Sequence, residues 1–176
     1  MDEQEKSIRF RQWVEEHYAY GLRLADRILG DKEEARDLVQ DAFVKVWENM
    51  EQYREGSRFT TWLYRILVNL CYDNLRKRKH RQRYSEEASR NEPSGLSDPT
   101  LNHETRDMKE WVIRLSWQLG EKQRVIMVLR DIEDMEMQEI IEITGLSPDQ
   151  VKANLYHARK TMRGLLEKLN LKEGKS

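Results

Sequence analysis

The sequence predicts an all-α protein with two small helical lobes, over residues 5–80 and 104–171, joined by a flexible linker over residues 81–103. Apolar residues recur at steps of three and four along both lobes, as on the buried face of a helix, and the linker lacks this period. The 176 residues include eight Gly and three Pro, too few for a disordered chain, and the many Lys, Glu, Leu and Arg residues favour helices.

The first lobe is predicted to contain three helices. The first spans residues 7–29 and ends at Gly30, a residue that commonly terminates helices, and Asp31 then caps the second. The second helix covers residues 35–50, where the apolar period runs without a break. The third begins near Phe59, after a turn-like Glu-Gly-Ser sequence, and runs into the basic sequence RKRKHRQR.

The second lobe ends in a more specific pattern. Ser147 can cap a helix, and Gln150 three positions later completes a Ser-x-x-Gln capping box. The sequence over residues 139–163 then predicts a helix, a short turn containing Gly, and a second helix with cations on its outer face. This order of elements is typical of a helix-turn-helix motif.

The net charge of -1 conceals an uneven distribution along the chain. Residues 54–84 carry nine cationic and two acidic side chains, and residues 151–176 carry seven and two. Acidic side chains predominate over residues 1–53 and 85–150. Two basic blocks separated by acidic ones predict two polyanion-binding surfaces that are held apart on one chain.

Several classes of protein are disfavoured. No apolar run reaches the roughly 20 residues that span a bilayer, and the first residues do not resemble a signal peptide, so we expect a cytoplasmic protein without membrane insertion. The single cysteine, Cys71, cannot form an internal disulfide and has no metal-ligand spacing to other residues, so we expect no metal and no cofactor. The four histidines fit no catalytic motif, and we expect no enzyme.

The helix-turn-helix indicates DNA binding, although hairpins of two helices with a Gly turn also occur in proteins that bind no DNA. Side chains in the early turns and on the outer face of the second helix are the candidate contacts: Gln150, Lys152, Ala153, Tyr156, Arg159, Lys160 and Arg163. In the third helix of the first lobe, aromatic, amide and basic side chains precede the basic block. Aromatic faces stack on unpaired bases while cations follow phosphates, which favours single-strand binding over a merely solvated helix end.

Two longer stretches resemble a known family. Residues 37–79, DLVQDAFVKVWENMEQYREGSRFTTWLYRILVNLCYDNLRKRK, closely resemble region two of bacterial sigma factors. Residues 119–166, LGEKQRVIMVLRDIEDMEMQEIIEITGLSPDQVKANLYHARKTMRGLL, resemble region four. With no region-three domain between them, the whole chain resembles a group-four, extracytoplasmic-function (ECF) sigma factor.

The resemblance implies a protein that binds core RNA polymerase, recognises two promoter elements and helps to melt the upstream edge of the transcription bubble. It implies that Asp37, Gln40 and Asp41 dock on the clamp helices of the largest subunit, and that the second lobe meets the flap of the second-largest subunit. Without the resemblance, the polar, mostly acidic helix face that carries Asp37, Gln40 and Asp41 would be explained by contact with solvent alone. The resemblance also implies regulation by an anti-sigma factor or another recruiting protein.

The resemblance also assigns promoter contacts. For the minus-ten element they are Tyr53, Ser57, Arg58, Phe59, Trp62, Arg65, Asn69, Tyr72, Arg76, Lys77 and Arg78. For the minus-thirty-five element, Ser147 and His157 join the seven residues named for the helix-turn-helix. The alternative function is a helix-turn-helix regulator that does not bind core polymerase, which leaves residues 37–79 unexplained.

The chain departs from the family pattern at three positions. Gly120 stands where relatives often carry Pro, which predicts a less rigid helix start. Asn154 and His157 replace two cations of the recognition helix, and a typical His is mostly uncharged at neutral pH. We therefore expect a weaker minus-thirty-five contact.

Overall fold

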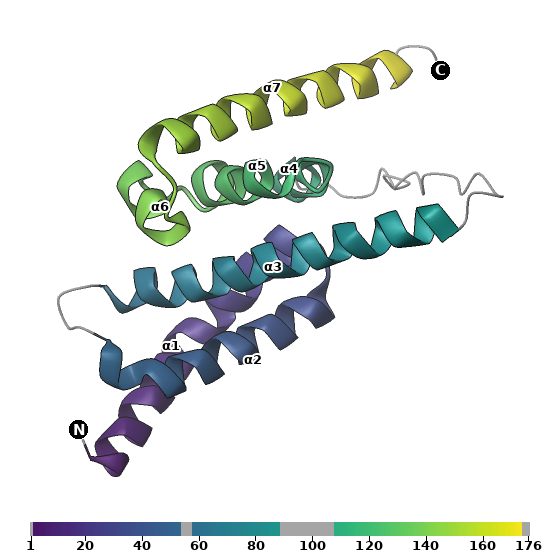
Figure 1. Cartoon of the computed structure of the whole chain (residues 1–176). Coiled ribbons are helices and arrows are strands. Elements are labelled where there is room, and N and C mark those ends of the chain that lie inside the picture. The colour runs from purple at the N-terminus through teal and green to yellow at the C-terminus, as the bar shows by residue number, and fades with distance from the viewer. Residues whose placement is uncertain (1, 54–57, 89–107, 174–176) are drawn as a thin grey trace.

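A computed structural model describes residues 2–53, 58–88 and 108–173, and every regular element in these ranges is helical (Figure 1). The all-α prediction is confirmed. The elements are α1 (Glu3–Leu29), α2 (Lys32–Asn49), a 3-10 turn η1 (Met50–Gln52), α3 (Phe59–Ala88), α4 (Met108–Ser116), α5 (Glu121–Met127), a π-helical segment η2 (Val128–Ile132), α6 (Met137–Thr144) and α7 (Pro148–Glu173). None of the helices in the described part of the chain is both long and apolar enough to cross a membrane.

The connection between α1 and α2 follows the prediction. Gly30 adopts a left-handed conformation, φ 69°, and its N–H donates to the carbonyl of Asp26 at 2.8 Å. A residue with a side chain is disfavoured there, which explains why Gly ends the helix. The Asp31 carboxylate then accepts hydrogen bonds from the backbone N–H groups of Glu33 and Glu34, both at 3.0 Å, and so caps α2.

The helix-turn-helix of α6 and α7 is confirmed as well. Gly145 ends α6 with a φ of 68°. The Ser147 hydroxyl accepts from the Gln150 N–H at 3.2 Å, and the Gln150 amide oxygen accepts from the Ser147 N–H at 3.0 Å. These reciprocal bonds are the predicted capping box, and they fix the angle at which α7 leaves the turn.

One boundary differs from the prediction. Helix α3 continues to Ala88, eight residues into the segment 81–103 assigned to the linker, of which residues 89–103 lie outside the described part. Arg81, Gln82 and Tyr84 in this part of the helix are exposed, in keeping with the lack of an apolar period. Residues 81–88 also contain no Gly or Pro and several good helix formers, so the helix does not stop where its buried stripe stops.

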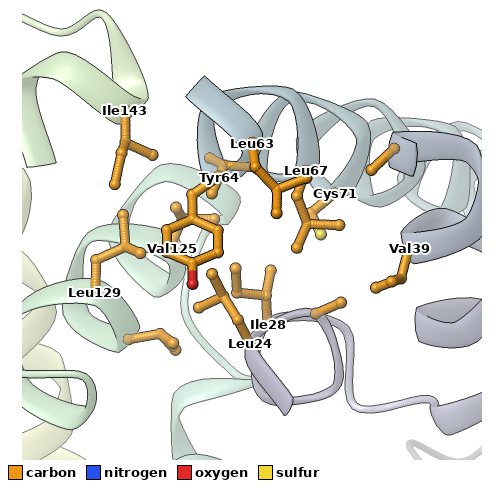
Figure 2. Close-up of a cluster of buried hydrophobic side chains, with 14 of the residues drawn as sticks. Leu24, Ile28, Val39, Leu63, Tyr64, Leu67, Cys71, Val125, Leu129 and Ile143 are labelled. Carbon is orange, nitrogen blue, oxygen red and sulfur yellow. The ribbon is translucent and has the colours of Figure 1, made fainter. Parts of the chain in front are cut away.

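The two lobes share a core. In the first lobe, α1 and α2 pack on α3 through buried residues such as Leu24, Val39 and Leu67. The same apolar cluster continues into α5, η2 and α6, with Val125 and Ile143 also buried (Figure 2). Helix α3 therefore lies between α1 and α2 on one side and the second lobe on the other (Figure 1). The two lobes predicted from the sequence are present, but they are not held apart.

A second, smaller cluster holds the second lobe together. It brings α7 onto α4 and α5 and consists of Leu115, Leu119, Met127, Ala158 and Met162, all of them buried. Its members on α7 belong to the apolar stripe predicted from the sequence. Because this stripe is used on the inside, the opposite face of α7 is available to a partner.

Candidate functional site

The predicted polymerase-binding residues share one exposed face of α2. Asp37, Gln40 and Asp41 are exposed, whereas the opposite side of the helix is buried on α1 and α3. The face also includes Val44, whose side chain is 54% exposed although its residue type favours burial. Val44 is absent from the contacts predicted from the sequence, because the resemblance identified only polar side chains on this face. A polar face with one exposed apolar residue is a suitable docking surface for a protein partner.

Aromatic rings fix both ends of the segment that joins α2 to α3. Trp13 of α1 stacks on Phe59 with ring centroids 3.9 Å apart. Tyr53 contacts Trp13 edge-on at 5.5 Å and Trp62 at 5.2 Å. Tyr53, Phe59 and Trp62 are half-buried in this cluster, in which the rings of Tyr53 and Phe59 lie 6.0 Å apart. The predicted contact Ser57 lies within that segment, outside the described residues.

Helix α3 presents a line of polar and basic side chains to solvent. Arg65, Asn69, Arg76 and Lys77 are exposed, and so is Arg58, which directly precedes the helix. Arg65 and Asn69 are one helical turn apart and therefore neighbours on the surface. A short amide beside a long cation can read a base edge and hold a phosphate at the same time.

Tyr72 is turned inward instead. It is half-buried, its hydroxyl is completely buried without a hydrogen-bond partner in the described ranges, and burial raises the pKa of its phenol. The predicted contact with DNA does not fit this position. We leave Tyr72 out of the interface proposed below.

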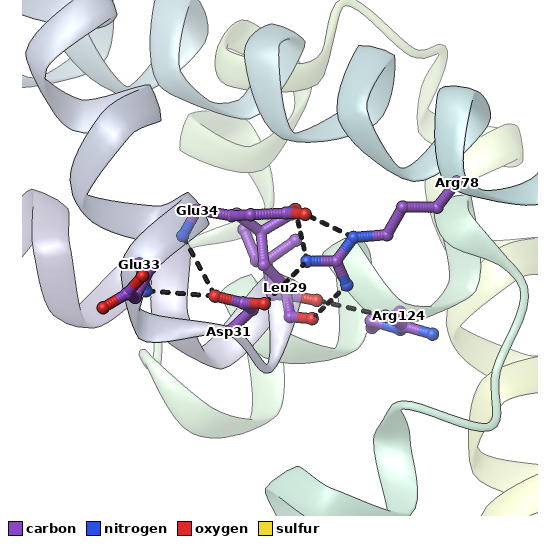
Figure 3. A network of polar contacts seen from close by, with 7 residues as sticks. Leu29, Asp31, Glu33, Glu34, Arg78 and Arg124 are labelled. Carbon is purple, nitrogen blue, oxygen red and sulfur yellow. Dashed lines mark hydrogen bonds and ion pairs between the residues drawn. The ribbon is translucent and has the colours of Figure 1, made fainter. Parts of the chain in front are cut away.

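The Arg78 side chain forms hydrogen bonds within the first lobe (Figure 3). Its guanidinium donates to the Glu34 carboxylate, with Nε 2.9 Å from Oε2, and to the carbonyl of Leu29 at 2.9 Å. It also lies near Asp31, at 3.9 Å. These bonds tie α3 to the turn between α1 and α2, so Arg78 is left out of the proposed DNA contacts as well, while the exposed Arg76 and Lys77 remain.

The outer face of α7 carries the candidate contacts of the helix-turn-helix. All nine of them are exposed: Ser147, Gln150, Lys152, Ala153, Tyr156, His157, Arg159, Lys160 and Arg163. Tyr156 is 63% exposed and its ring lies 5.3 Å from that of His157. This face is therefore accessible over several turns, in the manner of a helix that enters a major groove.

Two side chains of α7 are engaged within the lobe. Arg159 forms a two-point ion pair with Asp131, at 3.0 and 2.5 Å, and this hydrogen bonding raises the pKa of its guanidinium. The Asn154 amide donates to the carbonyl of Gln150 at 2.8 Å. Asn154 is half-buried, so its side chain bonds to the helix rather than projecting from it.

The described residues give little support for metal binding or for catalysis by a nucleophilic cysteine. Within the described ranges, no group of three or more His, Cys, Asp or Glu side chains is placed to hold a metal ion. Cys71 is buried, and burial raises the pKa of its thiol to about 12, so the nucleophilic thiolate is scarcely populated near neutral pH. Cys71 therefore acts as a small buried apolar residue of the core.

Family models match both lobes. The model described as Sigma-70 region 2 matches residues 13–81, and that described as Sigma-70, region 4 matches residues 109–162. The chain is thus a sigma-70-type protein. The SigV RNA polymerase sigma factor of Bacillus subtilis is 31% identical over 158 residues, which cover 90% of this chain and 91% of the relative. The SigW ECF sigma factor of the same organism is 28% identical, over 84% and 83% of the two chains. The chain belongs to the ECF sigma factors, as its resemblance predicted.

Solved structures share the fold. The sigma factor RpoE of Bartonella quintana, in complex with the anti-sigma factor NepR, superimposes with a TM-score of 0.66 and 22% identity, over 90% of this chain and 96% of that one. CnrH in complex with the cytosolic domain of CnrY gives a TM-score of 0.61 and 24% identity, over 90% and 87%. Both likenesses extend over both lobes.

Proposed function

We propose that this chain is an alternative sigma factor, which binds core RNA polymerase and directs it to a specific set of promoters. The observation that carries the proposal is the presence of both sigma-70 regions, in order, in a chain that matches ECF sigma factors over nearly its whole length. Polymerase supplies the catalysis in this scheme. The place of action would be the cytoplasm, where polymerase and DNA are found.

The exposed face of α2 is proposed to dock on the clamp helices of the largest subunit. Asp37, Gln40 and Asp41 supply charge and hydrogen bonds, and Val44 adds an apolar contact to the face. The second lobe would meet the flap of the second-largest subunit. Complementary charge at such an interface mainly directs association and fixes the register of the partners.

The exposed side of α3 and the segment before it are proposed to bind the minus-ten element. The aromatic cluster brings Tyr53 and Phe59 together, and a base extruded from the stack would be held beside these rings. Arg65 and Asn69 lie next along the helix, and an extruded base can be read on its Watson-Crick edge by a short polar group such as that of Asn69. Arg76 and Lys77 would follow the phosphates.

The outer face of α7 is proposed to bind the minus-thirty-five element weakly. The Asn154 amide bonds to its own helix, and Arg159 is already paired with Asp131. Recruitment would then depend on the minus-ten contacts, on polymerase, or on an additional protein that raises the effective concentration at the promoter. An anti-sigma factor is the expected antagonist, because two proteins of this fold are found in complexes with NepR and CnrY.

The test is reconstitution with purified core polymerase. The full chain should co-elute with core enzyme in gel filtration and should allow it to initiate at promoters that core enzyme alone ignores. A chain that binds DNA but never associates with core enzyme would instead be the helix-turn-helix regulator of the alternative reading, and the proposal would be wrong.

A further inference from the structure

A cavity of about 420 Å³ lies between the end of α1 and helix α4. Small-molecule sites in proteins commonly have volumes of about 300 to 1,000 Å³ and often lie where two domains meet. None of the residues that line this cavity is among those proposed above to contact polymerase or promoter DNA. Its lining therefore has no role in the functions considered so far.

Helix α4 contributes the apolar part of the lining. Ile113 and Trp117 are one helical turn apart and so lie on the same face of α4. Ile113 is buried and Trp117 is half-buried. The Trp117 ring is held in place, because its Nε1 donates to the carbonyl of Arg27 at 3.1 Å. A fixed indole beside an aliphatic side chain favours a flat aromatic ring as its ligand.

Cations line the cavity on the side of α1 and α2. Arg23 belongs to α1, and Lys32 is the first residue of α2. Both are exposed, and neither forms an ion pair with a carboxylate in the described ranges. The other two cations of the lining, Arg27 and Arg114, are already paired with Glu133 and Glu110. Arg23 and Lys32 are therefore the two cations available to an anion.

The end of α1 does not oppose an anion here as a bare helix end would. The last carbonyls of a helix carry partial negative charge and have no partner within the helix. In addition to the bond from Trp117, the Ile28 carbonyl accepts from Arg124 Nη1 at 3.2 Å, and the Leu29 carbonyl accepts from Arg78 Nη1 at 2.9 Å. Burial lowers the pKa of Arg124 to about 10, so this donor remains charged at neutral pH.

Asp26 gives the cavity a hydrogen-bond acceptor. It is half-buried and lies on the same face of α1 as Arg23. A carboxylate repels a phosphate, but it is a common partner for the hydroxyl groups of a ribose. A ligand that carries hydroxyl groups as well as an anionic group matches both side chains.

We propose that this cavity is a binding site for a small nucleoside phosphate. The base packs on Trp117 and Ile113, the ribose hydroxyl groups donate to Asp26, and the phosphate lies between Arg23 and Lys32. Four cationic and two acidic side chains line the cavity, so the lining keeps the positive charge that an anionic ligand requires. This inference goes beyond the proposed function and does not depend on it.

The test is calorimetric titration of the full chain with adenosine monophosphate. Adenosine lacks the phosphate, and inorganic phosphate lacks the base and the ribose. Phenyl phosphate has a ring and a phosphate but no ribose, so it distinguishes a nucleoside site from a site for any aromatic phosphate. We expect adenosine monophosphate to bind with a dissociation constant below about 1 mM, and each of the other three compounds to bind at least about fivefold more weakly.

Variants locate the binding in the cavity. Arg23→Gln/Lys32→Gln should weaken the binding of adenosine monophosphate at least about tenfold, because hydrogen bonds to charged groups are lost. Arg36→Gln/Lys45→Gln is the matched control, which removes the same charge from exposed positions of α2 outside the lining and should leave the affinity unchanged. Asp26→Ala should weaken the binding of adenosine monophosphate but not that of phenyl phosphate. Circular dichroism establishes that each variant is folded.

Three outcomes would overturn the inference. Adenosine monophosphate would fail to bind at about 1 mM, or the two double variants would lose the same affinity, which would place the binding elsewhere on the chain. Inorganic phosphate or phenyl phosphate could also bind as tightly as the nucleotide, which would exclude recognition of a nucleoside. The measurements require neither polymerase nor DNA, so a failure of this site and a failure of the proposed function are distinguishable.

Discussion

The indole of Trp117 lies directly against the backbone of Gly30, so closely that a β-carbon at Gly30 would be 2.7 Å from the ring. The two residues belong to different lobes, and the same ring donates to the carbonyl of Arg27. Gly30 thus serves two purposes: its left-handed conformation ends α1, and its missing side chain leaves room for the second lobe.

This contact predicts a difference between two glycines. Both Gly30 and Gly145 have positive φ angles, so Ala at either position should cost about 1 to 2 kcal/mol of unfolding free energy through backbone strain. A β-carbon at Gly145 meets only the flexible end of Arg65, whereas one at Gly30 displaces Trp117. Urea unfolding should show the larger loss for Gly30→Ala, together with a change in Trp fluorescence before unfolding. Equal losses would mean that the contact between the lobes contributes little.

Reversal of one charge on α2 should abolish polymerase binding. Asp41→Arg places a cation against the basic partner proposed for this face and should prevent co-elution with core polymerase. The side chain is exposed, so the unfolding free energy should change by only about 0.5 kcal/mol. Glu15→Arg makes the same change at an exposed site of α1 and should leave assembly intact. A folded Asp41→Arg chain that assembles normally would refute the docking face.

Substitutions along α3 should separate base recognition from phosphate contact. Asn69→Ala should cost on the order of 1 to 3 kcal/mol of discrimination at one base position, the usual scale for a lost base contact. The double variant Arg76→Gln/Lys77→Gln should weaken binding to all sequences and flatten its dependence on salt. Open-complex assays on single-base promoter variants distinguish the two. The assignment of Asn69 fails if its variant shifts every promoter alike.

Cations restored on α7 should strengthen the minus-thirty-five contact. Each added phosphate contact steepens the slope of log affinity against log salt by about 0.9, so Asn154→Arg/His157→Arg should steepen it by at most about 1.8. His157 is exposed and Asn154 half-buried, so the single His157→Arg variant should account for most of the change. The assay is holoenzyme binding to promoter DNA across a salt series. The full chain is required, because the second lobe alone would expose its side of the shared core. An unchanged slope would show that this face does not meet DNA.

Stability should depend on pH through His17. Burial lowers the pKa of His17 below its usual 6.5, and its ring lies 5.1 Å from that of Phe59 in the aromatic cluster. The unfolded chain therefore binds the proton more readily, so the stabilising effect of a neutral His17 is complete above pH 6.5 and declines as the pH falls below it. The midpoint of urea unfolding should fall less between pH 7.5 and pH 5.5 in His17→Gln than in the wild type, with His157→Gln, at an exposed site, as the control. An identical decline in His17→Gln would exclude this residue as the cause.

Local features of this fold could be predicted from sequence because they depend on a few adjacent residues. The cap at Gly30 and Asp31 and the capping box of Ser147 and Gln150 are of this kind. The apolar period also identified the buried faces of α1, α2 and α7 correctly, but in α4 it included Met108, which is 73% exposed. It does not say which element covers a buried face, and so the common core of the two lobes could not be foreseen.

The same limit applies to the candidate site. Arg76 and Arg78 are chemically identical and two positions apart, yet one points to solvent and the other binds Glu34. On a helix of 3.6 residues per turn, side chains two positions apart point in directions that differ by about 200°. This rotation separates Arg76 from Arg78, but the position of Glu34 depends on tertiary packing. Trp117 and Arg124 carried no signal at all, because their partners are backbone carbonyls, which every residue has.

The common core also makes the two lobes one cooperative unit of folding. Local openings that break few buried contacts cost little free energy, whereas those that break the core approach the cost of global unfolding. Since α3 is packed on both sides, its central amides should exchange with deuterium only when both lobes lose structure together. A partner that separates the lobes would thus destabilise α3 in the same step in which the exposed side of α3 binds DNA. A mutation in the buried part of the helix-turn-helix lobe would also lower the stability of the first lobe.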